Sequence, residues 1–182
     1  MAEMLHQRVT LSTGVELDVW TAGDAANPPI LFLHGFPESH RTWRHQMAAL
    51  SDHYFCSAPD QRGYARSQKL PEVKDYRIGN LVADVFALAD AFGADRFTLV
   101  GHDWGGAIAW MAALQNPARI TRLVIVNAPH PAAVVARSTI GHMLPDVVFG
   151  CIDQAMPGVV KYWLPSRMSA ALRPPRCSMP RD

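Results

Sequence analysis

Residues 101–106, GHDWGG, place a carboxylate among glycines where two different patterns meet. An apolar run at 97–100 precedes them and a helical pattern at 107–114 follows, which is typical of the strand–turn–helix of a nucleophile elbow. Small flanking residues let the chain turn sharply and push the central side chain into the open. The central residue is Asp103. Because a carboxylate is ionised at neutral pH, it can attack an electrophilic carbon without a base to activate it.

A second loop supplies hydrogen-bond donors for this chemistry. Residues 34–38, HGFPE, follow the apolar run 30–33. Where a chain forms an elbow, a backbone N–H of such a loop and the N–H after the nucleophile together form an oxyanion hole. In this chain those two N–H groups belong to Phe36 and Trp104. Pro37 has no N–H to donate, but it fixes the turn behind Phe36.

The elements that must position these residues alternate between strand and helix patterns. Short apolar runs predict parallel strands at 30–33, 54–58, 97–100 and 123–126, after an edge hairpin of 8–11 with 15–20. Apolar residues at helical spacing predict helices near 43–50, 78–92 and 107–114. This order predicts an α/β fold with a mostly parallel sheet and helices on both faces. Ligand sites in such sheets lie at the carboxyl ends of the strands.

The composition limits the partners and the compartment. The net charge of +1 produces no strong field for nucleic acid or for an anionic membrane. No apolar stretch is long enough to span a bilayer, and the first residues lack the apolar core of a signal peptide. Three widely spaced cysteines argue against a disulfide framework, so we expect a cytoplasmic protein. The sequence gives no prediction of the oligomeric state.

One further polar segment follows a predicted strand. Residues 60–67, DQRGYARS, are rich in charge and contain Gly63, but they have neither nucleophile nor metal-ligand spacing. We therefore interpret this segment, called the brace loop below, as a structural support for the loops beside the site.

Four motifs, in their order and spacing, resemble the epoxide hydrolases of the α/β-hydrolase superfamily. They are HGFPE at 34–38, DQRGY at 60–64, GHDWGG at 101–106 and NAPHP at 127–131, and the match covers roughly residues 8–131. The resemblance implies an α/β-hydrolase fold that is incomplete on its C-terminal side, as in a truncated chain. Residues 1–131 would form the N-terminal part of the core, and 132–182 the partly disordered start of a cap or an aberrant tail. Ala65 departs from the pattern, because the family usually has a second glycine there.

The resemblance also implies a two-step hydrolysis of a small apolar epoxide with no metal or organic cofactor. Asp103 would attack a ring carbon to give an alkyl ester on the enzyme, and water activated by a His–acid pair would then release a vicinal diol. In the family two tyrosines of the cap donate hydrogen bonds to the ring oxygen. Tyr162 is the only tyrosine in residues 132–182 that could take such a place. Pro37, Trp104 and Tyr162 are therefore the predicted substrate-binding residues.

The sequence does not identify the histidine that turnover would need as a base. In the family it follows the last core strand, well beyond the cap, and nothing after Val126 has the pattern of a core strand followed by His. We expect this chain to lack both that His and its acid partner. His34, His102 and His130 lie within the motifs, and each is interpreted as a structural residue in preference to a base.

Two other functions remain open. Haloalkane dehalogenases share the Asp nucleophile and often the Trp after it. Many of them carry Asn or Glu at the position of Phe36, where Asn can help to hold the departing halide. Phe36 cannot do this, so it favours epoxides. The third possibility is a non-catalytic remnant or binding module, which the missing base favours. Loss of later core strands would also leave an open sheet edge.

Overall fold

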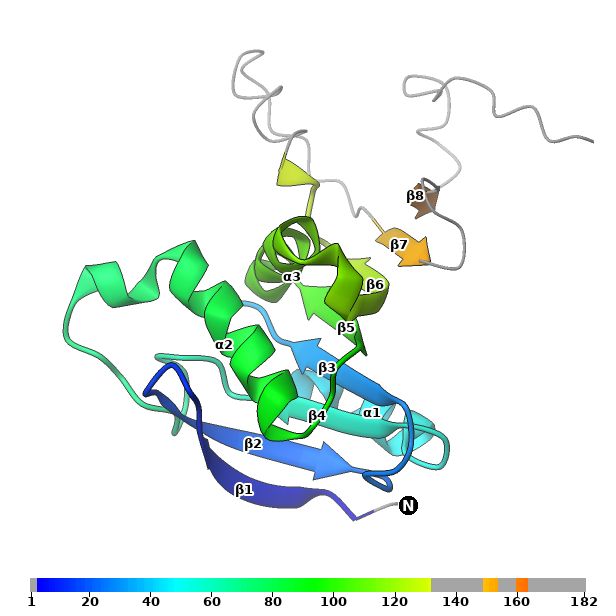
Figure 1. Cartoon of the computed structure of the whole chain (residues 1–182), viewed down its shortest axis with the longest axis horizontal. Helices are drawn as coiled ribbons and strands as arrows, with labels where there is room; N and C mark the ends of the chain where they lie inside the picture. Colours follow the sequence, from blue (N-terminus) through cyan, green and yellow to red (C-terminus); the bar gives the residue numbers. More distant parts are fainter. Residues whose placement is uncertain (1–2, 132–148, 154–159, 164–182) are drawn as a thin grey trace, which may run out of the picture.

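An eight-stranded sheet, in the order β1-β2-β4-β3-β5-β6-β7-β8, forms the centre of the computed structural model of this chain (Figure 1). The structure describes residues 3–131 in full and residues 149–153 and 160–163 by their backbone. The strands are β1 (Leu5–Thr10), β2 (Glu16–Ala22), β3 (Pro29–Leu33), β4 (Phe55–Pro59), β5 (Phe97–His102), β6 (Ile120–Val126), β7 (Phe149–Asp153) and β8 (Val160–Trp163). All six strands predicted from the sequence are present, with ends shifted by up to three residues.

The four central strands, β4, β3, β5 and β6, run parallel, whereas the β1–β2 hairpin pairs antiparallel with β4 through β2. This arrangement confirms the predicted α/β fold with a mostly parallel sheet covered by helices. Because β3 and β5 are parallel neighbours, the segments that follow their carboxyl ends lie side by side. Residues 34–38 and 101–106 are those segments.

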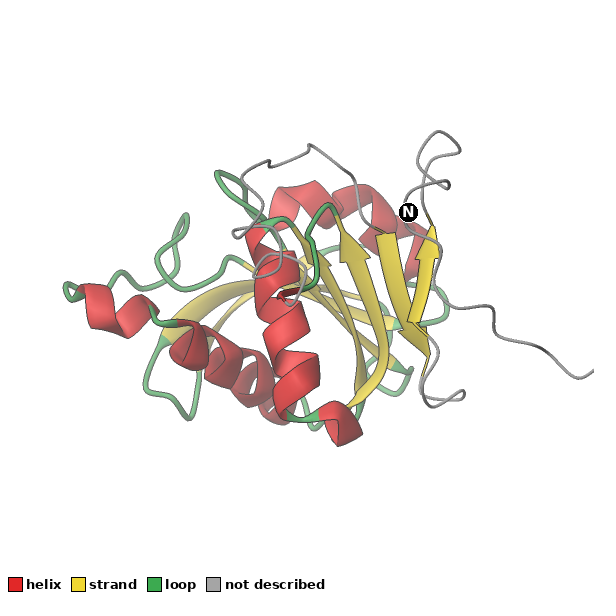
Figure 2. Cartoon of the chain, turned by 90° about the horizontal axis from the view of Figure 1, so that it is seen from above, coloured by secondary structure: helices red, strands yellow, loops and turns green. Residues whose placement is uncertain are grey.

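Helices cover both faces of the sheet (Figure 2). The α-helices are α1 (Arg44–Leu50), α2 (Ile78–Ala91) and α3 (Trp104–Gln115), and the 3-10 helices are η1 (His40–Trp43), η2 (Val73–Tyr76) and η3 (Pro117–Arg119). Successive residues of β3 point to opposite faces: Leu31 and Leu33 pack with α2 and α3, whereas Phe32 packs with Trp43 and Met47. Within the described residues, no helix has the length and apolar character needed to cross a membrane.

Two strands follow Val126 that the sequence patterns did not predict. β7 pairs antiparallel with β6, Val124 lying opposite Cys151, and β8 pairs antiparallel with β7. The β6 edge is therefore covered, contrary to the open edge expected there, and its backbone groups have partners. β7 was missed because Gly150 and Asp153 are of types depleted in strands.

Tyr162 lies in β8, in register with Gly150, and β6 and β7 separate its strand from β5. Most of the segment predicted to start a cap, residues 132–148, 154–159 and 164–182, lies outside the described residues.

Candidate active site

Asp103 occupies a strained turn between β5 and α3. Its φ of 50° and ψ of −117° lie outside the backbone regions that residues with a side chain ordinarily adopt. The turn is fixed from both sides, because the Asp103 N–H donates to the Val126 carbonyl (3.1 Å) and the Asp103 carbonyl accepts from the Ala107 N–H (3.0 Å). Strain held in this way at a polar side chain indicates a functional position. The elbow predicted from the sequence is thus present in the structure.

Two glycines allow the loops to meet at the elbow. A Cβ on Gly105 would lie 2.4 Å from the carbonyl oxygen of Leu33, so α3 can start only where this side chain is absent. A Cβ on Gly35 would lie 2.6 Å from the Cβ of Asp103. The 34–38 loop therefore passes directly against the carboxylate, at a distance that only glycine permits.

The 34–38 loop directs a backbone donor at the carboxylate. The Phe36 N–H donates to Oδ1 of Asp103 at 3.0 Å. Behind it, the Glu38 N–H donates to the Gly35 carbonyl (3.2 Å) and closes a turn that contains Pro37, whose peptide bond with Phe36 is cis. The structure therefore brings Phe36, Pro37 and Asp103 together, as expected from the sequence.

Trp104 is the first residue of α3, and Asp103 is its N-cap. The first N–H groups of a helix have no partner within the helix, and the helix dipole stabilises negative charge at this end. The side chains of Phe36 and Trp104 are 65% and 59% exposed. Large apolar side chains exposed beside a carboxylate are a feature of candidate ligand sites.

Tyr64 of the brace loop lies beside the candidate site, a position that the sequence did not predict. Its ring lies edge-on to those of Phe36 (centroids 6.5 Å apart) and His34 (4.8 Å). Burial raises the pKa of the Tyr64 phenol, and the negative charge of Asp103 raises it further. No sequence signal separated Tyr64 from the structural residues around it.

Glu38 links the 34–38 loop to the elbow. Its Oε2 accepts from the Gly35 N–H (2.9 Å) and lies 3.0 Å from Nδ1 of His102. Burial alone would raise the pKa of Glu38, but the Gly35 N–H and His102 outweigh it and hold the pKa below its usual value. The sequence did not predict the contacts of Glu38 with Gly35 and His102. The three-residue spacing of Gly35 and Glu38 does suit a tight turn closed by a side chain.

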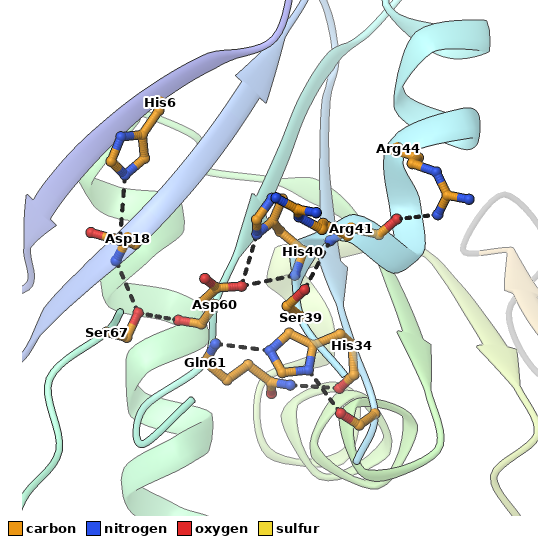
Figure 3. A network of polar contacts seen from close by, with 11 residues as sticks. His6, Asp18, His34, Ser39, His40, Arg41, Arg44, Asp60, Gln61 and Ser67 are labelled. Carbon is orange, nitrogen blue, oxygen red and sulfur yellow. Dashed lines mark hydrogen bonds and ion pairs between the residues drawn. The ribbon is translucent and has the colours of Figure 1, made fainter. Parts of the chain in front are cut away.

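The brace loop is hydrogen-bonded to the 34–38 loop and to the start of η1 (Figure 3). The Gln61 N–H donates to Nε2 of His34 (3.1 Å), and the Gln61 side-chain amide donates to the His34 carbonyl (2.6 Å). Next to them, Oδ1 of Asp60 accepts from the backbone N–H of His40 (2.8 Å) and lies 2.9 Å from its Nδ1. These contacts support the structural role expected for the loop.

The remainder of the brace loop is tied to helix α2. Arg62 donates through Nε (2.8 Å) and Nη2 (2.7 Å) to the two carboxylate oxygens of Asp84, and through Nη1 to the Asp75 carbonyl (2.7 Å). Ala65 adopts a left-handed φ of 41°. The alanine therefore takes the conformation for which glycine is usual, and the loop shape is kept at a cost in strain.

The three histidines near the motifs differ in their surroundings. Both ring nitrogens of His34 have partners, since Nδ1 lies 2.8 Å from the Gly35 carbonyl oxygen. His102 faces Glu38, and the ring of His130 lies edge-on to Trp110 (4.7 Å). Among the described residues, no three His, Cys, Asp or Glu side chains are grouped to hold a metal ion.

Comparisons with known proteins agree with this geometry. Residues 28–148 match the family described as the alpha/beta hydrolase fold. Epoxide hydrolase B of Mycobacterium tuberculosis is 44% identical over 147 residues, which cover 76% of this chain and 40% of that protein. An epoxide hydrolase structure from Vigna radiata, 36% identical, superposes with a TM-score of 0.67 over 76% of this chain and 47% of its own. A structure described among novel epoxide hydrolases from metagenomes of hot environments is 53% identical, with a TM-score of 0.69 over 71% and 44% of the two chains.

The chain spans about a third to somewhat over half of the length of the curated relatives that it matches. The part that matches carries the Asp103 elbow and the 34–38 loop.

Proposed function

This chain belongs to the α/β hydrolase fold family, and we propose that Asp103 is the nucleophile of an epoxide hydrolase reaction. The observation that carries the proposal is the contact of the Phe36 N–H with Oδ1 of Asp103 at 3.0 Å, in an elbow whose φ is 50°. A carboxylate so held is fixed at one oxygen and free to react through the other. The similarity to epoxide hydrolases supports epoxides as the substrate class.

In the first step, Oδ2 of Asp103 attacks a ring carbon of the epoxide. A new C–O ester bond forms, the ring C–O bond breaks, and its electron pair moves to the ring oxygen, which takes up a proton. Because this leaving group is a poor one, a hydrogen-bond donor must face it. Phe36, Pro37 and Trp104 would contact the apolar part of the substrate, and we propose Tyr162 as one candidate donor.

In the second step, water attacks the ester carbonyl carbon of Asp103. Oδ1 becomes the oxyanion of the tetrahedral intermediate, and the Phe36 N–H already points at it. We propose that the Trp104 N–H, at the start of α3, is the second donor of this oxyanion hole. Collapse of the intermediate expels the diol and regenerates the carboxylate.

The second step also needs a base, and the histidines of residues 3–131 near the elbow have other contacts. His34 has partners at both nitrogens, and His102 lies against Glu38. We therefore propose that the 182-residue chain forms the ester faster than it hydrolyses it. In the family, a His and an acid partner are required for efficient turnover.

A time course with an aryl epoxide tests this proposal. Intact mass should show one adduct per chain that accumulates, because diol release is much slower than ester formation. Steady diol formation by the purified chain would contradict the claim that the base is absent. Failure of a folded chain to form any adduct would contradict the role of Asp103.

The same assay separates the two other functions. With an alkyl halide, a dehalogenase would release halide, and Phe36 gives no side-chain donor to receive it. A binding module would hold either compound reversibly and gain no mass.

We also propose a cytoplasmic location, for which the state of Cys56 gives support. Cys56 is a free thiol in the core, and burial raises its pKa to about 11. A protonated, buried thiol is compatible with a reducing compartment.

A further inference from the structure

The peptide group that joins Gly35 to Phe36 has hydrogen bonds at both of its ends. Its N–H, on Phe36, donates to Oδ1 of Asp103 (3.0 Å). Its carbonyl, on Gly35, accepts from the Glu38 N–H (3.2 Å) and faces Nδ1 of His34 (2.8 Å). Donors on the carbonyl of a peptide group polarise its N–H and strengthen the bond that this N–H makes. The Gly35–Phe36 peptide group therefore connects the ring of His34 to the carboxylate of Asp103.

The protonation state of the His34 ring follows from its second partner. Nε2 lies 3.1 Å from the backbone N–H of Gln61, which can only donate. Nε2 must then be the acceptor and carries no proton. Burial of His34, which is 0% exposed, lowers the pKa of its imidazole despite the opposing effect of the Gly35 carbonyl, so the ring is neutral. The single proton of the neutral ring is on Nδ1, which donates to the Gly35 carbonyl.

Gln61 fixes this arrangement from two directions. Its backbone N–H defines the tautomer, and its side-chain amide donates to the carbonyl of His34 (2.6 Å), as Figure 3 shows. Gln61 is itself only 8% exposed. Neither the ring nor the backbone of His34 can turn away without leaving a buried polar group unpaired, which typically costs about 1–3 kcal/mol.

We propose that His34, held in one tautomer by Gln61, is a positioning residue that orients and polarises the Phe36 N–H for the reaction at Asp103. It does not touch the substrate, and it acts only through the Gly35–Phe36 peptide group. The catalytic part of this inference rests on the proposed function, whereas the hydrogen-bond chain itself can be measured without substrate.

A matched pair of variants separates this role from simple packing. The amide nitrogen of Asn can occupy the position of Nδ1, so His34→Asn keeps a donor for the Gly35 carbonyl. The amide of Gln reaches the position of Nε2, so His34→Gln keeps a partner for Gln61 and loses that donor. Both variants replace the same buried ring with an amide. A packing role alone predicts that Gln, which is closer to His in volume, is the milder change, whereas the donor role predicts that Asn is.

The first readout is the Phe36 amide in the full chain labelled with 15N-phenylalanine, without substrate. In His34→Gln we expect its proton signal to move upfield and its hydrogen exchange to accelerate by about tenfold or more, whereas His34→Asn restores both towards the wild type. Equal shifts and exchange rates in the two variants would overturn the proposal.

The second readout is the lifetime of the Asp103 ester. We expect it to lengthen by about tenfold in His34→Gln and to be rescued in His34→Asn, a fraction of the ~100–1000-fold effect of losing a whole oxyanion donor. If the wild-type chain forms no ester, the proposed function fails, and the amide readout still decides the role of His34.

A third measurement needs no variant, in case the buried substitutions prevent folding. In the wild-type chain labelled with 15N-histidine, the nitrogen signals of the His34 ring should show a protonated Nδ1 and an unprotonated Nε2. A proton on Nε2 would overturn the proposal.

Discussion

The elbow at 101–106 and the brace loop at 60–67 lie at the same edge of the sheet and use polar residues in opposite ways. Asp103 has strained backbone angles, and its neighbour Trp104 is 59% exposed. In the brace loop, Asp60 and Arg62 are buried, and their charges meet fixed partners. The brace loop, which carries more charge, therefore supports the fold, whereas the elbow combines backbone strain with an exposed neighbouring residue. The number of polar residues in a loop does not identify a site. A polar side chain in a strained turn beside exposed residues is the more informative feature.

The largest effect on stability should come from breaking the buried ion pair of the brace loop. Arg62 and Asp84 are both 6% exposed and joined by two hydrogen bonds. Arg62→Met leaves the Asp84 carboxylate buried and uncompensated, so we expect a loss of about 3–5 kcal/mol in the free energy of unfolding, measured in urea. The double variant Arg62→Met/Asp84→Leu should recover part of it. An effect under 1 kcal/mol would show that the pair is not a structural support.

At the elbow, we expect a substitution to cause a smaller loss of stability and a large loss of ester formation. In Gly105→Ala the new Cβ would start 2.4 Å from the Leu33 carbonyl, so α3 or β3 must shift. We expect a loss of about 1–3 kcal/mol in stability, together with a disproportionate loss of ester formation. As a control, Gly79→Ala in α2 has no heavy atom within 4 Å of the new Cβ. Equal stability and equal ester formation in the two variants would argue against the close approach of Gly105 to the Leu33 carbonyl.

Glu38, which joins the two loops, predicts a pH dependence. The Gly35 N–H and His102 hold its pKa below the usual value despite burial. A carboxyl with a depressed folded-state pKa adds stability above its unfolded pKa of about 4.3, and this stability is lost as the pH falls through the folded-state value. Glu38→Gln should therefore be less stable than the wild type at pH 7, with the difference shrinking towards pH 3. A difference that is constant over this range would contradict the assignment.

The smallest effect concerns backbone strain in the brace loop. Ala65→Gly should stabilise the fold by about 0.5–1 kcal/mol, because glycine adopts a φ of 41° without the penalty of a side chain. The matched control is Ala83→Gly, on the exposed face of α2, which should destabilise by about 1 kcal/mol. If both changes destabilise alike in thermal unfolding, Ala65 is not strained.

The sequence predicted those parts of the fold that depend on local patterns. Apolar runs such as 97–100 identified the central strands, and the glycines of 101–106 identified the elbow, because close approach there excludes a Cβ. The contact of Phe36 with Asp103 was also anticipated, since parallel neighbouring strands place both loops at one edge.

Other features depend on distant segments that meet only in the folded chain. The Glu38–His102 contact, the tautomer of His34 and the position of Tyr64 depend on distances that no local pattern encodes. The β7 strand was missed for a related reason, since pairing with β6 outweighs its weak strand propensity. The predicted roles of Pro37, Trp104 and Tyr162 in binding substrate remain predictions.

Whether Asp103 reacts decides whether the elbow is the reactive region and the brace loop its support. The most direct measurement is peptide mapping by mass spectrometry of the full chain after incubation with an aryl epoxide, beside Asp103→Asn as the control. We predict one adduct, equal in mass to the epoxide, on the side chain of Asp103, and none in the variant. An unmodified Asp103 in a folded chain, or an adduct that persists in Asp103→Asn, would contradict the assignment of Asp103 as the nucleophile.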